Sequence, residues 1–238
     1  MTRVLNRYLC FLSLLLLQLG AHAQWEVRAF AGGGSGQIRT DLYPATSRGE
    51  FQVVDRRFSW LVGGSAKHKL SGPLSFSTGL HWSFIAGHDE YWQQDRKFRV
   101  QDRRVHYLCL PMMVNVDVHR FRLGAGYQLA TPLIESGTVS YYYSVWGVGL
   151  EDKIIDTKEL GLKCTDFGVV GEFDYQITDR MGVGARYYYG LQDIKDHSDG
   201  MLWPLMNEQL VLTISYRFLP KREDKTEEMP VQDPEPAE

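Results

Sequence analysis

The sequence has few cysteines, no surplus of positive charge and, beyond residue 23, no long apolar run. Its 238 residues include 3 cysteines, and 26 lysines and arginines stand against 29 acidic residues, for a formal net charge of −3. This balance argues against nucleic acid as a partner, because nucleic-acid binding depends on a basic surface. Cys109 and Cys164 fall on predicted strands that are not neighbours. We therefore expect both thiols to stay unpaired, even in an exported protein.

The N-terminal residues are typical of a targeting signal. Two early arginines precede an apolar run over residues 8–19, and Ala21-His22-Ala23 follows it. This layout predicts a secretory signal peptide over residues 1–23, cleaved before Gln24. The run is shorter than the ~20 apolar residues that a membrane-spanning helix needs, which argues against a membrane anchor. Because the rest of the chain has no apolar stretch of that length, it would have to enter a membrane as a closed barrel.

Apolar residues alternate with small or polar ones along most of the chain, and a period of two predicts strands. Residues 166–191 show this best, because two alternating runs flank a short polar turn and so predict an antiparallel hairpin. Glycine is plentiful, with 23 residues, and aromatics make up 13% of the chain, as expected for tight turns and interfacial rings. The eight predicted strands cover about residues 24–33, 51–64, 74–84, 107–116, 121–129, 166–175, 181–191 and 209–218.

The predicted connections alternate between long and short along the chain, and the long ones include loops over about residues 88–102 and 131–163. Outer-membrane barrels have short periplasmic turns and longer outside loops, and an even strand count returns both ends to the periplasm. A soluble, lipocalin-like ligand-binding barrel is the alternative, but it would point its apolar residues inward. We therefore predict an all-β fold, an eight-stranded antiparallel up-and-down transmembrane β-barrel over residues 24–218 in the outer membrane. Residues 219–238, acidic and proline-containing, are predicted to be a disordered periplasmic tail.

One face of the predicted strands collects charged residues, and the other collects aromatic and aliphatic ones. Unpaired charges are costly in a dry core, but they can pair across a narrow lumen while the apolar face meets lipid. We expect Arg186 to pair with Glu172 or Asp174, because the intervening turn brings these positions together. An eight-stranded barrel is filled by side chains, so no open pore is expected. The predicted lumen network comprises Glu26, Arg28, Arg57, His81, Arg122, Glu172, Asp174, Arg186 and Arg217.

Four stretches resemble one known family. YLCLPMMVNV, FRLGAGYQLA, ARYYYGLQDI and LTISYRF look like segments of the small PorT-like outer-membrane β-barrel proteins common in Bacteroidota. The resemblance covers about residues 24–218 and implies the barrel fold. It also implies that the terminal strand, residues 210–218, is read by the barrel-insertion machinery. The chain departs from the family at Cys109, where glutamate is often found, and in the tail that follows Phe218.

A lipid-modifying enzyme is the alternative function, with His81 as its candidate base. Ser77 and Ser83 are close in sequence, but strand spacing alone supplies neither a hydrogen bond nor an orienting acid. We therefore assign no catalytic residue. An acidic loop offers ligands for a hard cation, yet loop acids are usually solvated, and we expect no metal and no cofactor. The acidic loop residues are Asp193, Asp196, His197 and Asp199.

Aromatic residues in the predicted outside loops are the candidates for partner recognition. A membrane-interface belt or packing within the loops is the simpler interpretation. The leading hypothesis is a non-enzymatic integral outer-membrane barrel with a structural, adhesion or assembly-associated role. Its expected contacts are outer-membrane lipid and an extracellular or periplasmic protein. The candidate loop residues are Tyr91, Trp92, Tyr141, Tyr142, Tyr143 and Trp146.

Overall fold

The computed structural model describes residues 25–40, 50–93, 96–144, 150–156, 165–194 and 205–218. These residues form nine β-strands. Within them there is no helix of the length and hydropathy needed to cross a membrane. The predicted signal peptide and the predicted tail lie outside the described residues. The strands are β1 (Trp25–Thr40), β2 (Glu50–Ser71), β3 (Leu74–Gln93), β4 (Arg96–Val118), β5 (Phe121–Ser144), β6 (Leu150–Asp156), β7 (Asp166–Gln176), β8 (Met181–Gly190) and β9 (Leu205–Arg217).

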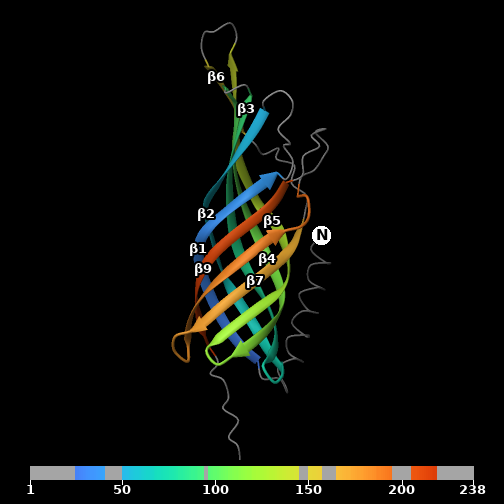
Figure 1. Ribbon diagram of the computed structural model, residues 1–238, viewed down its shortest axis with the longest axis vertical. Helices are drawn as coiled ribbons and strands as arrows, with labels where there is room; N and C mark the ends of the chain where they lie inside the picture. Colours follow the sequence, from blue (N-terminus) through green and yellow to red (C-terminus); the bar gives the residue numbers. More distant parts are fainter. Residues whose placement is uncertain are drawn as a thin grey trace, which may run out of the picture.

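Eight of these strands close into a single antiparallel ring (Figure 1). Neighbours around the ring follow the order β4-β3-β2-β1-β9-β8-β7-β5, and pairing between β4 and β5 completes it. The first and last strands seal the barrel in a continuous register from Arg28 opposite Arg217 to Thr40 opposite Leu205. The eight-stranded antiparallel barrel expected from the sequence is thereby confirmed.

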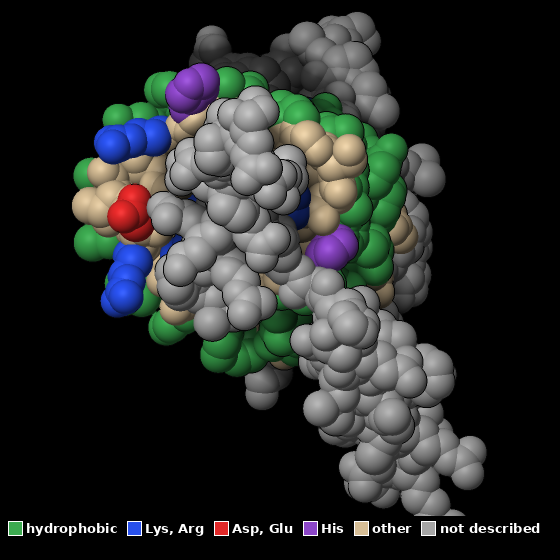
Figure 2. All heavy atoms as spheres, turned by 90° about the horizontal axis from the view of Figure 1, so that it is seen from below, with side chains coloured by type: hydrophobic (Ala, Val, Ile, Leu, Met, Phe, Trp, Pro, Cys, Tyr) green, Lys and Arg blue, Asp and Glu red, His purple; other side chains and the backbone are tan. Residues whose placement is uncertain are grey.

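The faces of the strands divide as the alternation predicts. Leu123, Leu212 and Ile214 on the outer face are 59%, 69% and 62% exposed. In the hairpin of β7 and β8, Phe173 and Tyr187 are exposed, whereas their neighbours in sequence are buried. Seen from the end that carries the short turns, hydrophobic side chains ring the barrel (Figure 2). Such an outer surface is stable only where lipid replaces water.

The short connections all lie at one end of the barrel, where the first and last strands also begin and end. Gly72 occupies the turn between β2 and β3 with φ of 55°, and His119 adopts the same φ between β4 and β5. Glycine reaches this left-handed region without steric cost. The turn between β7 and β8 is held by Thr178, whose hydroxyl accepts hydrogen bonds from the Arg180 and Met181 amides. By the rule for outer-membrane barrels, this is the periplasmic end.

At the opposite end, four strands continue beyond the ring, and β6 joins them (Figure 1). Together they form what we call the projecting sheet, residues 50–56, 87–93, 96–103, 137–144 and 150–156. The prediction of loops over residues 88–102 and 131–163 is wrong for much of these ranges. β3 and β4 run on until only residues 94–95 separate them, and β5 pairs with β6. The cause is that the hydrophobic alternation ends where the strands leave the lipid, so periodicity no longer signals a strand.

Candidate functional site

The centre of the lumen is organised around Arg28 on β1. Its guanidinium forms ion pairs with both Glu172 and Asp174 on β7. Its Nε donates a hydrogen bond of 2.9 Å to the Ser65 hydroxyl on β2. The side chain therefore connects two walls of the barrel, and the planar fork of arginine suits two carboxylates at once.

Arg186 on β8 is the second cation of this cluster. The register sets it directly opposite Glu172, and its Nη1 lies 3.4 Å from Glu172 Oε2. Its Nη2 donates a 3.0 Å hydrogen bond to Gln128 Oε1. The Phe30 ring lies 5.9 Å from the guanidinium carbons of both Arg28 and Arg186. The expected pairing of Arg186 with Glu172 or Asp174 is thus confirmed for Glu172.

Close packing against these carboxylates requires a glycine on the neighbouring strand. A Cβ atom at Gly184, opposite Asp174 in the register, would approach Asp174 Oδ1 to 2.3 Å and Phe173 O to 2.4 Å. Only a residue without a side chain leaves room for the Asp174 carboxylate to turn toward Arg28.

A second ionic cluster lies nearer the periplasmic end. Glu26 accepts from Lys67 at 3.1 Å, Arg122 at 3.1 Å and Arg217 at 3.0 Å. Asp117 adds a second carboxylate, 2.8 Å from Arg122 Nε and 2.8 Å from the Ser75 hydroxyl. Arg122 also lies 3.7 Å from Asp174, which links the two clusters. These ionic contacts join β1, β2, β4, β5, β7 and β9 across the lumen and hold the strands in register.

Toward the outer end, the lumen changes from ionic to apolar. Asn207 Nδ2 donates to Tyr107 Oη at 2.8 Å and to Asp166 Oδ2 at 2.7 Å. Around this group lies a buried apolar layer, to which Tyr107 belongs and to which the segment after β8 contributes Ile194, 1% exposed. The amide of Ile194 donates to Leu205 O at 2.9 Å, which joins the end of this segment to the start of β9. The apolar layer comprises Ile38, Ile85, Val105, Tyr107, Cys109, Ala130, Ile194 and Leu205.

Comparison with known proteins identifies the family to which this barrel belongs. The family model described as "Outer membrane protein beta-barrel domain" matches residues 18–196. The chain belongs to this outer-membrane β-barrel family. No curated protein sequence matches the chain.

Three solved structures of bacterial proteins are similar to this outer-membrane barrel. Ail of Yersinia pestis, the attachment invasion locus protein, has 12% identity and a TM-score of 0.42, covering 82% of this chain and 99% of its own. Neisserial surface protein A has 13% identity and a TM-score of 0.42, with 83% and 99% covered. OprG of Pseudomonas aeruginosa has 16% identity and a TM-score of 0.38, with 82% and 96% covered.

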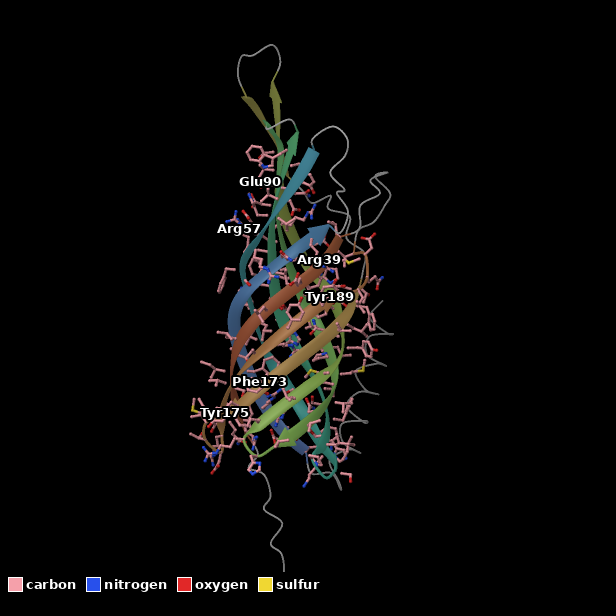
Figure 3. All side chains as sticks on the ribbon, viewed as in Figure 1. Arg39, Arg57, Glu90, Phe173, Tyr175 and Tyr189 are labelled. Carbon is pink, nitrogen blue, oxygen red and sulfur yellow. The ribbon has the colours of Figure 1, made fainter. Side chains whose placement is uncertain are left out.

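The lumen of the outer-membrane barrel contains most of the charged residues singled out in the sequence. Arg217 is half-buried, and seven others are buried; Arg57 is exposed instead. The irregularity in the pairing of β2 with β3, between Arg56 and Trp60, breaks the alternation just at this position. Figure 3 shows Arg57 pointing away from the barrel wall. Its assignment to the lumen network is therefore corrected. The seven buried residues are Glu26, Arg28, His81, Arg122, Glu172, Asp174 and Arg186.

Several members of the network were missed. Lys67 and Asp117 lie close to turns, where an alternating pattern is hard to assign to a face. Gln128 and Asn207 are neutral, and a search for charges passes over them. Asp166 and Tyr107 share the inward parity of their strands, and this parity would have identified them.

His81 has none of the contacts that catalysis requires. It is 2% exposed, its ring centroid lies 5.9 Å from that of Phe30, and its Nδ1 has no hydrogen-bond partner within the described part of the chain. Ser77 binds Asn115 and Ser83 binds Gln209, so neither serine is directed at the imidazole. A base in this position faces the lumen rather than the lipid.

The predicted loop aromatics lie mainly on strands. Tyr91 and Trp92 belong to β3, where Tyr91 is 7% exposed and Trp92 Nε1 donates to Glu90 Oε2 at 3.2 Å. The backbone of residues 141–143 belongs to β5 and pairs with β6, so the assignment of Tyr141, Tyr142 and Tyr143 to a loop is wrong. Trp146 lies outside the described residues.

The acidic loop supplies a structural contact at its described end. Asp193 Oδ1 accepts a 2.9 Å hydrogen bond from the Leu205 amide, which joins the residues after β8 to the start of β9. Asp196, His197 and Asp199 lie outside the described residues. Within the described ranges, no group of three or more histidine, cysteine or acidic side chains is arranged to hold a metal ion.

Proposed function

We propose that this outer-membrane barrel is a non-enzymatic surface protein whose projecting sheet is the binding surface for a protein partner, in adhesion or in envelope assembly. One observation carries the proposal. Four strands of the ring extend past the barrel, and a further strand, β6, joins their sheet. A barrel needs strands of only ~9 to 11 residues to cross the bilayer, whereas β5 has 24 and β4 has 23.

The filled lumen supports a role outside the barrel rather than through it. Ionic clusters occupy its centre and its periplasmic part, and the apolar layer around Ile194 covers the outer part. A water-filled path would have to break several buried ion pairs at once, each of which is costly to disrupt. The buried position of His81 likewise argues against the lipid-modifying enzyme.

The projecting sheet has the mixed surface expected of a recognition site. Its outer face carries His88, whose Nδ1 lies 2.7 Å from Asp102 Oδ1 and whose Nε2 lies 3.4 Å from Glu90 Oε1. Trp92 Nε1 also donates to Glu90 Oε2, so charged and aromatic side chains lie side by side here, and such groups offer both hydrogen bonds and apolar contact to a protein.

A complementation experiment tests the proposal. A strain lacking the protein receives either the full chain or a variant in which residues 139–155 are replaced by Asn-Gly, a sequence that closes two-residue hairpins. Heat-modifiable migration on detergent gels verifies that the variant still forms a barrel. Surface adhesion and sensitivity to large antibiotics are then compared between the two strains.

The proposal predicts that the variant inserts normally but fails to restore the phenotypes that the full chain restores. A matched control replaces Arg180 in the periplasmic turn with glutamine and should restore all of them. Full restoration by the shortened variant would overturn the proposal, since the projecting sheet would then have lost β6 and the outer end of β5 without effect. A His81→Ala barrel that alters labelled lipid A less than the full chain does would instead favour the enzyme.

A further inference from the structure

A group of aromatic side chains marks one level on the lipid-facing wall of β2, β3 and β4. Trp60 stacks on Phe84 with ring centroids 6.0 Å apart. Trp82 Nε1 donates a hydrogen bond of 3.2 Å to His106 Nδ1, and the Phe84 and His106 centroids are 4.9 Å apart. Tryptophan and other amphipathic rings collect at the boundary between hydrocarbon and headgroups. The outer boundary of the bilayer therefore passes through this group.

Two arginines stand directly on the headgroup side of this aromatic group. Arg104 lies two residues before His106 on β4 and is exposed. Arg57 lies three residues before Trp60 on β2, is exposed, and points away from the wall (Figure 3). Ala86 of β3 lies between them, paired with Arg104. Because β3 separates their strands, the two backbones are about 10 Å apart, with only a methyl group in between.

The described residues give neither arginine an ion pair or a hydrogen bond, which sets them apart from the other arginines at this height. Arg56 binds Glu208 at 2.5 Å, and the Arg39 guanidinium lies 4.0 Å from the Tyr189 ring centroid. The acid nearest Arg104 on its own strand face, Asp102, is bound to His88 at 2.7 Å. Arg57 and Arg104 thus present two guanidinium groups without an ion pair among the described residues at the headgroup level.

We propose that Arg57 and Arg104 bind the phosphates of a phosphorylated glycolipid of the lipid A type in the outer leaflet, whose acyl chains pack on the aromatic group below. Guanidinium forks bind phosphate oxygens in a bidentate manner. The proposal extends beyond the projecting sheet, because it concerns the barrel wall at the bilayer surface.

Lipid titration of the refolded full chain tests the inference. Native mass spectrometry measures retention of bis-phosphorylated lipid A and of the same lipid with its phosphates removed. The variants are Arg57→Gln with Arg104→Gln and, as a matched control, Arg120→Gln with Arg180→Gln. The control removes the same charge from exposed arginines of the periplasmic turns. Heat-modifiable migration verifies the fold of each barrel, and inorganic pyrophosphate serves as competitor.

The expected result is a preference of the full chain for the phosphorylated lipid that falls by roughly a hundredfold in the double variant, about tenfold for each arginine, and is unchanged in the control. Equal binding of both lipids by the full chain would overturn the inference. So would an equal loss in the control pair, which would show general attraction to positive charge. Displacement of the phosphorylated lipid by pyrophosphate at a concentration no higher than that of the lipid would assign the arginines to a soluble phosphate compound and would refute the lipid site.

Discussion

The substitution Arg28→Met tests whether the central ion pairs hold the barrel together. Methionine preserves much of the apolar stem but removes the charge from between Glu172 and Asp174. After the change, Glu172 keeps Arg186 at 3.4 Å, whereas the nearest cation to Asp174 is Arg122 at 3.7 Å. Removing one partner of a buried ion pair typically costs about 3–5 kcal/mol, because the other charge remains buried. We expect a loss in this range, most of it arising at Asp174.

The measurement is urea unfolding of the barrel refolded in lipid vesicles, followed by tryptophan fluorescence. With an m value of roughly 2 kcal/mol/M, the midpoint should fall by about 2 M. The control Arg120→Met, at an exposed turn position, should change the free energy of unfolding by less than about 0.5 kcal/mol.

A double-mutant cycle isolates the responsible contact. Arg28→Met combined with Asp174→Asn should be more stable than the sum of the single effects implies, by about 1–3 kcal/mol, because the neutral amide no longer needs a cation. A cost of Arg28→Met below about 1 kcal/mol, or additive effects of the two changes, would refute the claim that this ion pair stabilises the lumen.

Three further results are expected. Gly184→Val should destabilise the barrel by about 1–3 kcal/mol in the same urea assay, since a Cβ there would lie 2.3 Å from Asp174 Oδ1; an unchanged midpoint would contradict that packing. In a Cys164→Ser background, the Cys109 thiol, 1% exposed, should resist maleimide in the folded barrel and react after boiling, and rapid labelling without heat would show that the lumen is open. The full chain should show no ion conductance in planar bilayers, and Ile194→Asp, which charges the apolar layer, should lower stability by about 2–4 kcal/mol without creating a stable pore.

Residue pattern alone was enough to predict the barrel. Within the bilayer every strand must expose apolar side chains to lipid on alternate positions, so the period of two persists through β3, β7 and β8. The same rule assigned Glu172, Asp174 and Arg186 to the lumen. The pairing of Arg186 with Glu172 could be predicted from the sequence because a short turn fixes the register of their strands.

The sequence failed where lipid no longer imposes the pattern. Outside the bilayer both faces of a strand can carry polar groups, so residues 88–102 looked like a loop although they belong to β3 and β4. Arg57 has the parity of an inward residue, but an irregularity in the pairing of β2 with β3 turns it outward. No local pattern in the sequence predicts such an irregularity, because it arises from the pairing of two strands.

The sequence by itself therefore determined the class of the protein, its location and which face of most strands meets lipid. These properties depend on the local alternation of apolar and polar side chains, which the bilayer imposes on every strand that crosses it. Only the tertiary structure decided which charges meet. Arg28 and Glu172 are 144 residues apart in the chain, and they come together because closure of the ring brings distant strands to face one another across a narrow lumen. Closure also gave the barrel its apolar layer at the outer mouth, whereas the pairing of neighbouring strands decided the projecting sheet and the outward position of Arg57.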